Sequence, residues 1–229
     1  MKKLVAECIG TCVLVVCGCG TAMLVGCDAK NGAGYLLTAL AFGLTIVAMA
    51  YSIGNISGCH INPAVSLGVL MTGGMKAKEF FQYVIAQCIG GFLGSLILFA
   101  IFNVGGVVDQ THGLGTNGLG GVNGNAFAGL LVEVVLTYIF VLAILGVTSK
   151  KANHGSFGGL VIGLSLVLVH IFGIGLTGTS VNPARSLGPA IVSLFYGETG
   201  PLACVWVFFV GPFAGAALAA WTYKFLEAK

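Results

Sequence analysis

Long apolar stretches alternate with short polar connections along the whole chain. Six of them are about 20 residues long, the length that an α-helix needs to cross a bilayer, and they begin near Leu4, Tyr35, Phe80, Ala128, Phe157 and Ala203. Two shorter apolar stretches follow Asn62 and Asn182, and each is about half the spanning length. The pattern predicts an all-α membrane protein with six transmembrane helices and two re-entrant half-helices.

The composition also indicates that lipid is the main solvent. Of the 229 residues, 57% are hydrophobic and 7% are charged, whereas about a quarter of the residues in soluble domains are charged. The net charge of +3 forms no basic face, so membrane lipid and not nucleic acid is the expected partner. The eight cysteines lie mostly in apolar runs without paired CxxC motifs, so we expect packing residues, with no metal and no cofactor.

The lysines predict an orientation. Eight of the ten cations fall at ends or loops that six spans place on one side: Lys2, Lys3, Lys76, Lys78, Lys150, Lys151, Lys224 and Lys229. By the positive-inside rule, both termini are expected on the cytoplasmic side of the plasma or inner cell membrane, with Lys30 on the opposite side. The Gly- and Asn-rich loop over 103–125 is then external, and we predict no secondary structure in it.

The chain repeats itself. SGCHINPAVS at 57–66 reappears 120 residues later as TGTSVNPARS at 177–186. Each copy has three spans, an odd number, so the second copy enters the membrane in the opposite sense. We therefore expect one transmembrane channel domain, 1–229, built from inverted repeats of about 1–102 and 128–229 and joined by the external loop 103–127. Such repeats place function at the midplane between the copies.

An Asn-Pro-Ala triplet opens each shorter apolar stretch: Asn62, Pro63 and Ala64 in the first, Asn182, Pro183 and Ala184 in the second. Proline is favoured at the first position of a helix, which makes each asparagine an N-cap. The backbone before each triplet would expose unpaired carbonyls, which a bilayer tolerates only beside a wet cavity. The predicted pore-lining residues are Gly58, Cys59, His60, Ile61, Gly178, Ser180 and Val181. Two positive helix ends at the centre would disfavour cations.

These paired segments, together with Glu7, Gln87 and Glu133, closely resemble the aquaporin (major intrinsic protein) family over essentially the whole chain, nearest to its bacterial water channels. The resemblance implies a right-handed bundle, water as the substrate, and a homotetramer with one pore in each subunit. The GxxxG pairs of the third and sixth spans are equally consistent with packing inside one subunit: Gly90 and Gly94, Gly211 and Gly215.

Three positions at which the repeat breaks converge on one depth. Arg185, His170 and Phe42 stand where the other copy has valine, alanine and isoleucine. At ~1.5 Å per residue, each lies ~10 Å below the outer surface. An arginine buried in a membrane is expensive and normally faces a cavity. The resemblance implies that the same three residues form an aromatic/arginine constriction, with Thr179 as its fourth member.

This composition of the constriction favours water. A polyol would need a wider and more apolar passage, and related glycerol facilitators typically have an aspartate where this chain has Ser186. The expected function is a passive water channel, driven by osmotic gradients, that excludes protons and ions. The alternative is a facilitator of glycerol or other small neutral solutes. A coupled secondary transporter would need an ionisable pair at the midplane, and no nucleophile–base constellation indicates an enzyme.

Glu7 and Glu133 occupy matching places in the first and fourth spans. Carboxylates there could relay protons, but their symmetric placement favours a scaffold role, in which they accept hydrogen bonds from the re-entrant loops. Cys59 is the repeat partner of Thr179, so it should lie beside the pore in the cytoplasmic half. Small mercurials are therefore expected to block the pore partly through Cys59. The sequence leaves undecided whether the adjacent His60 gates the pore in response to pH.

Overall fold

The computed structural model describes residues 1–27, 32–149, 151 and 155–228. Lys30, Lys150 and Lys229, which entered the orientation prediction, lie outside the described residues. Within those ranges all the regular secondary structure is helical, and there is no strand. The elements are α1 (Lys2–Leu14), η1 (Val15–Cys19), α2 (Gly20–Val25), α3 (Gly32–Ser57), α4 (Pro63–Met71), α5 (Ala77–Gly105), η2 (Gly120–Val122), α6 (Ala126–Val147), η3 (Gly155–Phe157), α7 (Gly158–Thr177), α8 (Pro183–Val192), η4 (Ser193–Tyr196), α9 (Gly200–Cys204) and α10 (Val207–Glu227).

The six predicted spans are confirmed among the described residues. Helical segments long and apolar enough to cross a membrane are Lys2–Val25, Gly32–Ser57, Ala77–Gly105, Ala126–Val147, Gly158–Thr177 and Gly200–Glu227. The first of them joins α1, η1 and α2, and the last joins α9 and α10. The apolar runs predicted these spans because each has the length and hydropathy that a bilayer requires.

The prediction that 103–125 lacks secondary structure was wrong. Helix α5 continues to Gly105 and stops where Gly106 adopts a left-handed conformation with φ of 60°, so that its N–H and that of Val107 bond back to the last turn. This is a common glycine-dependent helix stop. A short 3₁₀ turn, η2, follows later in the same stretch. We call residues 106–125 the outer loop.

Glycines bring the long helices into backbone contact inside this one chain. A Cβ on Gly90 of α5 would collide with the carbonyl group of Cys8 in α1, and a Cβ on Gly215 of α10 would collide with the carbonyl of Val134 in α6. The GxxxG pairs therefore pack α5 against α1 and α10 against α6. They serve packing within the subunit, one of the alternatives that the sequence left open.

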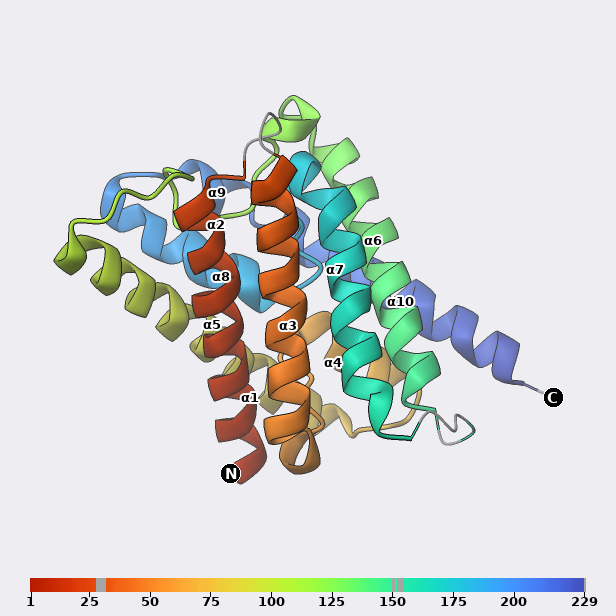
Figure 1. Cartoon of the computed structure of the whole chain (residues 1–229). Helices are drawn as coiled ribbons and strands as arrows, with labels where there is room; N and C mark the ends of the chain where they lie inside the picture. Colours follow the sequence, from red (N-terminus) through yellow and green to blue (C-terminus); the bar gives the residue numbers. More distant parts are fainter. Residues whose placement is uncertain (28–31, 150, 152–154, 229) are drawn as a thin grey trace.

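The two halves of the chain interlock. Helix α4 packs against α10, whereas α8 packs against α5, so each half-helix rests on a long helix from the other half. Helices α3 and α7, which run side by side in Figure 1, cross at Gly43 and Gly163, and a Cβ on either glycine would meet the backbone oxygen of the other. The centre of the molecule is therefore built from both halves together.

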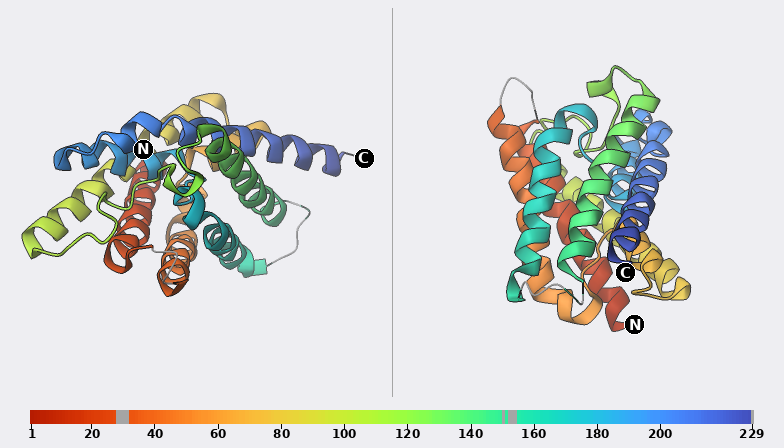
Figure 2. Two further views of the ribbon diagram at one scale, coloured as in Figure 1. Left: turned by 90° about the horizontal axis from the view of Figure 1, so that it is seen from above. Right: turned by 90° about the vertical axis from the view of Figure 1, so that its right-hand side faces the viewer.

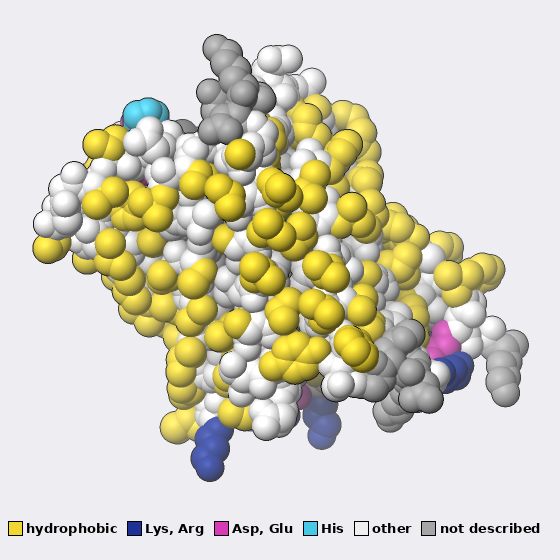
Figure 3. Space-filling model, viewed as in Figure 1, with side chains coloured by type: hydrophobic (Ala, Val, Ile, Leu, Met, Phe, Trp, Pro, Cys, Tyr) yellow, Lys and Arg dark blue, Asp and Glu magenta, His cyan; other side chains and the backbone are white. Residues whose placement is uncertain are grey.

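The surface has the character of a multi-pass membrane protein. Hydrophobic side chains are spread across the face shown in Figure 3, and lysine side chains lie along its lower edge. Long aliphatic side chains such as Leu44, Ile85 and Leu168 are exposed within the spans, which is expected where lipid replaces water. The two termini lie at the same end of the bundle, as the right-hand view of Figure 2 shows.

Candidate functional site

The half-helices α4 and α8 both begin at proline, and the preceding asparagine caps each of them. Asn62 Oδ1 accepts a hydrogen bond from the N–H of Ala64 at 2.8 Å. Asn182 Oδ1 accepts from the N–H groups of Ala184 at 3.1 Å and Arg185 at 3.3 Å. These caps fix both asparagine side chains and leave their amide groups directed away from their own helices.

The two asparagine amides then cross between the halves. Asn62 Nδ2 donates to the carbonyl oxygen of Val181 at 2.7 Å, and Asn182 Nδ2 donates to that of Ile61 at 2.9 Å. Ile61 and Val181 hold φ values of 41° and 45°, which are strained for β-branched residues. This reciprocal pair joins the N-termini of α4 and α8 at the centre of the fold.

Glu7 supports the first loop, residues 58–61. Its buried carboxylate accepts hydrogen bonds from Ser57 Oγ at 2.6 Å, from the N–H groups of His60 at 2.9 Å and Ile61 at 2.6 Å, and from Gln87 Nε2 at 2.7 Å. Two loop N–H groups that have no helical partner are thereby satisfied away from water.

Glu133 supports the second loop, residues 178–181, in the same manner. Its buried carboxylate accepts from Thr177 Oγ1 at 2.7 Å and from the N–H groups of Ser180 at 2.9 Å and Val181 at 2.8 Å. The N–H groups of each loop therefore turn toward a carboxylate in a span. Because the loop N–H groups face the carboxylate, the loop carbonyls are free to face away from it.

An inner cavity of about 540 Å³ runs along these loops. One end is lined by Gly73, Gly74 and Glu227, near the end of the bundle that holds the termini, and the other end reaches Phe42 and Arg185. Of the predicted pore-lining residues, the inner cavity is lined by Gly58, Cys59, His60, Ser180 and Val181. An elongated cavity between the two loops is the form that a pore lining requires.

The opposite wall of the inner cavity was not predicted from the sequence. Phe140, Leu145 and Leu166 line it. Apolar residues in a span satisfy either lipid or a hydrophobic pore wall, so hydropathy alone does not distinguish these residues from those that face the membrane. The cavity therefore has one polar wall, made by the loops, and one apolar wall, made by α6 and α7.

An outer cavity of about 470 Å³ lies beyond Arg185, which lines both cavities. Gly178 of the second loop, Gly115 of the outer loop and Cys27 line it as well. Burial raises the pKa of the Cys27 thiol, which keeps this thiol protonated and weakly nucleophilic at neutral pH. The two cavities meet at the arginine.

The structure brings Phe42, His170 and Arg185 together at this meeting point, which we call the constriction. The Phe42 and His170 rings are stacked with their centroids 4.4 Å apart, and Arg185 Cζ lies 5.0 Å from the Phe42 centroid. His170 Nδ1 lies 3.0 Å from the Leu166 carbonyl oxygen; donation to this carbonyl leaves Nε2 as an acceptor. Among the described residues, neither His170 Nε2 nor Arg185 Nε has a hydrogen-bond partner.

Other predicted site residues lie behind the lining. Thr179, Ile61 and the prolines and alanines of both triplets are buried, and none of them is among the described residues that line these two cavities. A Cβ on Gly173 of α7 would meet Thr179 Oγ1, so this hydroxyl points toward α7. The Thr179 side chain therefore does not line either cavity, which leaves only its backbone for the role predicted at the constriction.

The outer loop binds the side chain of Arg185, a contact that sequence reasoning missed. Arg185 Nη1 donates to the Gly115 carbonyl at 3.0 Å. Asp109 shapes this stretch, because its carboxylate accepts from the N–H groups of Thr111 at 2.8 Å and Leu114 at 2.7 Å. Asp109 is a single acidic residue in a loop rich in Gly and Asn, and this isolated charge was the sequence feature that could have indicated an ordered loop.

A second link joins the outer loop to the second loop and α8. Asn117 Nδ2 donates to the Thr177 carbonyl at 3.1 Å, and its Oδ1 accepts from Ser186 Oγ at 2.8 Å. The ion pairs among the described residues, Lys3–Glu79 and Lys151–Glu227, are at accessible positions and do not involve Arg185. No carboxylate in the described part of the chain therefore forms an ion pair with Arg185.

Comparison with known proteins places these features in a family. Residues 1–223 match the family described as Major intrinsic protein. The chain is 42% identical to Aquaporin Z from Brucella melitensis, over 98% of this chain and 97% of that protein. It is 40% identical to Aquaporin Z from Photorhabdus laumondii, over 100% and 99%. An X-ray structure of the aquaglyceroporin from Plasmodium falciparum shares the fold, with a TM-score of 0.86 and 24% identity over 97% of this chain and 95% of that one.

Proposed function

The chain belongs to the major intrinsic protein family, and from that premise we propose that it is a passive water channel driven by osmotic gradients. One observation carries the proposal: the inner and outer cavities meet at a constriction whose free polar groups are His170 Nε2 and Arg185 Nε. An acceptor and a donor beside a phenyl ring suit a molecule that both donates and accepts hydrogen bonds.

Water is favoured over glycerol by the chemistry of this constriction. The phenyl ring of Phe42 is stacked on His170 and lies under Arg185, so the apolar surface at the constriction is partly covered by polar groups. A carbon backbone would need an uncovered apolar wall there. Ser186 follows Arg185, and its hydroxyl is bonded to Asn117 within the protein. A facilitator of small neutral solutes remains the second candidate.

Exclusion of protons and other cations follows from fixed positive charge. Arg185 lines both cavities and is 3% exposed, so a cation that passes it loses solvation beside a like charge. The N-termini of α4 and α8 add their positive dipole ends at the crossed asparagines. These features suit a channel better than an enzyme or an ion-coupled transporter.

The proposed setting is the plasma or inner cell membrane, with both termini cytoplasmic and two inverted repeats per chain. Six of the lysines behind this orientation lie in the described ranges, at or near the ends of spans: Lys2, Lys3, Lys76, Lys78, Lys151 and Lys224. The positive-inside rule places these ends in the cytoplasm. Assembly as a homotetramer rests on membership of the family alone, because the GxxxG glycines are used inside the chain.

The test is stopped-flow light scattering on proteoliposomes. A step of impermeant osmolyte should give fast shrinkage with a low activation energy, and a subsequent glycerol gradient should give no rapid re-swelling. Empty liposomes provide the control. Rapid re-swelling in glycerol would favour the facilitator, and shrinkage no faster than in empty liposomes would refute a channel for water.

A further inference from the structure

The first span contains a π-helical turn beside the constriction. It is η1, Val15–Cys19, and it lies between α1 and α2. A π turn is rare in proteins and often occurs at functional sites, because its extra residue shifts the direction of neighbouring side chains. Val15, Gly18 and Cys19 of this turn are buried. The role proposed above for the constriction does not use any of them.

Gly18 lies directly against the face of the Phe42 ring. A Cβ built on Gly18 would be closer than 3.0 Å to three consecutive ring carbons, Cδ1, Cε1 and Cζ. Near-equal distances to three neighbouring carbons place this point over the ring face and not at its edge. Ordinary contacts between carbons are about 3.5–4.0 Å. The ring therefore occupies space that exists only because residue 18 has no side chain.

The other face of the ring is covered by the remaining members of the constriction. His170 is stacked on Phe42 with an interplanar angle of 27°, and it cannot share the face that Gly18 occupies. Arg185 Cζ lies 5.0 Å from the ring centroid. Phe42 is thus clamped between the backbone of η1 and the polar groups of the constriction. Any push from η1 would drive the ring toward His170 and Arg185.

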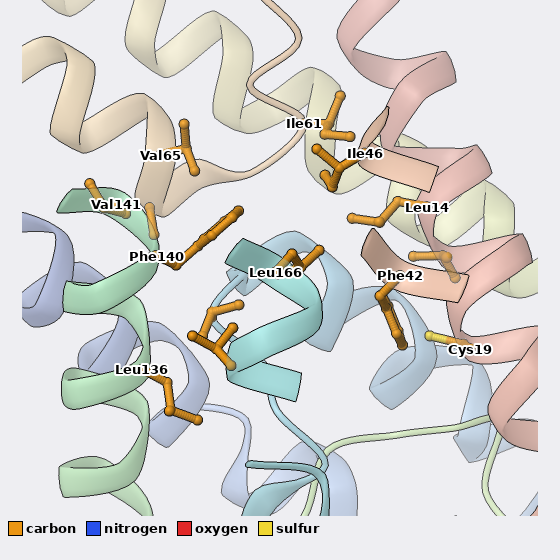
Figure 4. Packing of buried hydrophobic residues seen from close by; sticks show 14 of the residues in the cluster. Leu14, Cys19, Phe42, Ile46, Ile61, Val65, Leu136, Phe140, Val141 and Leu166 are labelled. Atoms are coloured by element: carbon orange, nitrogen blue, oxygen red, sulfur yellow. The ribbon is translucent and has the colours of Figure 1, made fainter. Parts of the chain in front are cut away.

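The same π turn also backs the arginine. A Cβ on Gly115 of the outer loop would lie 3.1 Å from Cys19 Cβ and from the Cys19 carbonyl oxygen, so this loop rests on η1. The Gly115 carbonyl in turn accepts the hydrogen bond from Arg185 Nη1. Figure 4 shows Cys19 and Phe42 as neighbours within the buried cluster. Two members of the constriction are therefore placed through successive residues of one turn.

We propose that Gly18 is a specificity-determining position, at which the missing side chain lets Phe42 withdraw far enough to admit a water molecule. The proposal rests on the proposed function as a water channel. In it, η1 is a positioning element: Gly18 sets the distance of Phe42 from His170, and Cys19 supports the loop carbonyl that holds Arg185. A methyl group at residue 18 must displace the ring by roughly 1 Å to restore ordinary contact.

The test is Gly18→Ala in proteoliposomes, with water permeability normalised to folded protein. The expected result is a fall of about tenfold in permeability, with a higher activation energy, because pore diameter limits passage. Gly20→Ala is the matched control. It lies in the same span and is also buried, but its Cβ would meet the flexible Leu98 Cδ2 instead of a constriction residue. Permeability in this control should match that of the unaltered protein.

Phe42→Leu provides the second background and keeps the test decisive. Without the ring there is nothing to displace, so adding Gly18→Ala to Phe42→Leu should leave water permeability within about twofold. An equal fall in both backgrounds, or no fall in either, would overturn the inference. If Gly18→Ala alone does not fold, the double variant must fold, and its failure would also overturn it.

The unaltered protein separates the two hypotheses. A parent that conducts no water overturns the proposed function together with this inference. A parent that conducts water, combined with a folded and fully active Gly18→Ala variant, overturns the inference alone.

Discussion

The two re-entrant loops share a framework and differ in what holds them. In each, a buried glutamate accepts the N–H groups of two loop residues, a β-branched residue takes a left-handed conformation, and an asparagine caps the half-helix. The similarity extends to the reciprocal bonds of Asn62 and Asn182. These shared features build the same backbone turn twice.

The difference lies in the neighbours. The first loop is braced by side chains of α5: Gln87 donates to both Glu7 and Ser66, and the Tyr83 hydroxyl donates to the Ser57 carbonyl. The second loop and α8 are tied to the outer loop through Asn117 and through Arg185. The features that the two loops share support the fold. The polar groups of the constriction are found where the second loop and α8 differ from the first loop and α4.

The largest effect is expected from replacing the two carboxylates, and the two loops should respond unequally. Each oxygen of Glu7 accepts two donors, so the amide nitrogen of Glu7→Gln must face two of them. Glu133→Gln can place its nitrogen opposite the N–H of Val181. With about 1–3 kcal/mol for each unsatisfied donor, Glu7→Gln should lose about 2–6 kcal/mol of unfolding free energy and Glu133→Gln about 1–3 kcal/mol.

Thermal unfolding in detergent micelles would measure this difference. Glu79→Gln is the control, since Glu79 pairs with Lys3 at an accessible site where such pairs contribute about 0–1 kcal/mol. Folded variants should keep their selectivity. A Glu7→Gln protein that folds normally but conducts protons would contradict the scaffold role and favour a proton relay.

Arg185→Val would give the second copy the residue that stands at Val65 in the first. It removes the buried charge and the donor to the Gly115 carbonyl. Loss of about 1.4 kcal/mol from a barrier raises passage about tenfold, so glycerol uptake and proton leak should both rise by at least this factor. Glycerol re-swelling and a pH-sensitive dye trapped in proteoliposomes would measure them. Lys78→Val is the control, because Lys78 is an exposed cation in the first turn of α5, and it should change neither flux. Unaltered glycerol and proton flux in Arg185→Val would refute the role of Arg185 in selectivity.

Asn117→Ala would cut the link between the outer loop and α8. The loss of its buried bonds to Thr177 and Ser186 should cost about 1–3 kcal/mol of stability. It should also loosen Arg185 and raise glycerol leak modestly. Asn103→Ala is the control, because the Asn103 side chain also makes two hydrogen bonds near the outer end but is exposed. Equal effects of the two variants on glycerol leak would show that the outer loop does not position the constriction.

The smallest effect on the unmodified channel is expected from Cys59→Ser, which compares Cys59 with its repeat partner Thr179. Cys59 lines the inner cavity, so a bound mercurial should partly block water passage, and the serine variant should conduct normally and resist the block. Cys17→Ser, an exposed thiol in the first span, should remain sensitive. Block that persists in Cys59→Ser would point to another thiol, such as Cys27 in the outer cavity.

The sequence by itself determined the spans, the half-helices and their caps. Apolar length is a local property that a bilayer selects directly, and Asn-Pro at a helix start acts within three residues. The spacing of Phe42, His170 and Arg185 along their elements also sufficed to predict a common depth, because a helix rises uniformly with residue number. In the structure these three side chains are in mutual contact.

Only the tertiary structure decided what these elements do to one another. The glycine pairs pack inside the chain, and the Phe42 ring occupies the space beside Gly18 that a side chain would fill. Asp109 shapes the loop whose Gly115 carbonyl accepts the hydrogen bond from Arg185. Each of these contacts joins segments far apart in sequence, and a glycine has the same composition whether it meets lipid, another subunit or a ring in its own core. Hydropathy reports the need for burial, whereas the partner in that burial is chosen by the packing of the whole bundle.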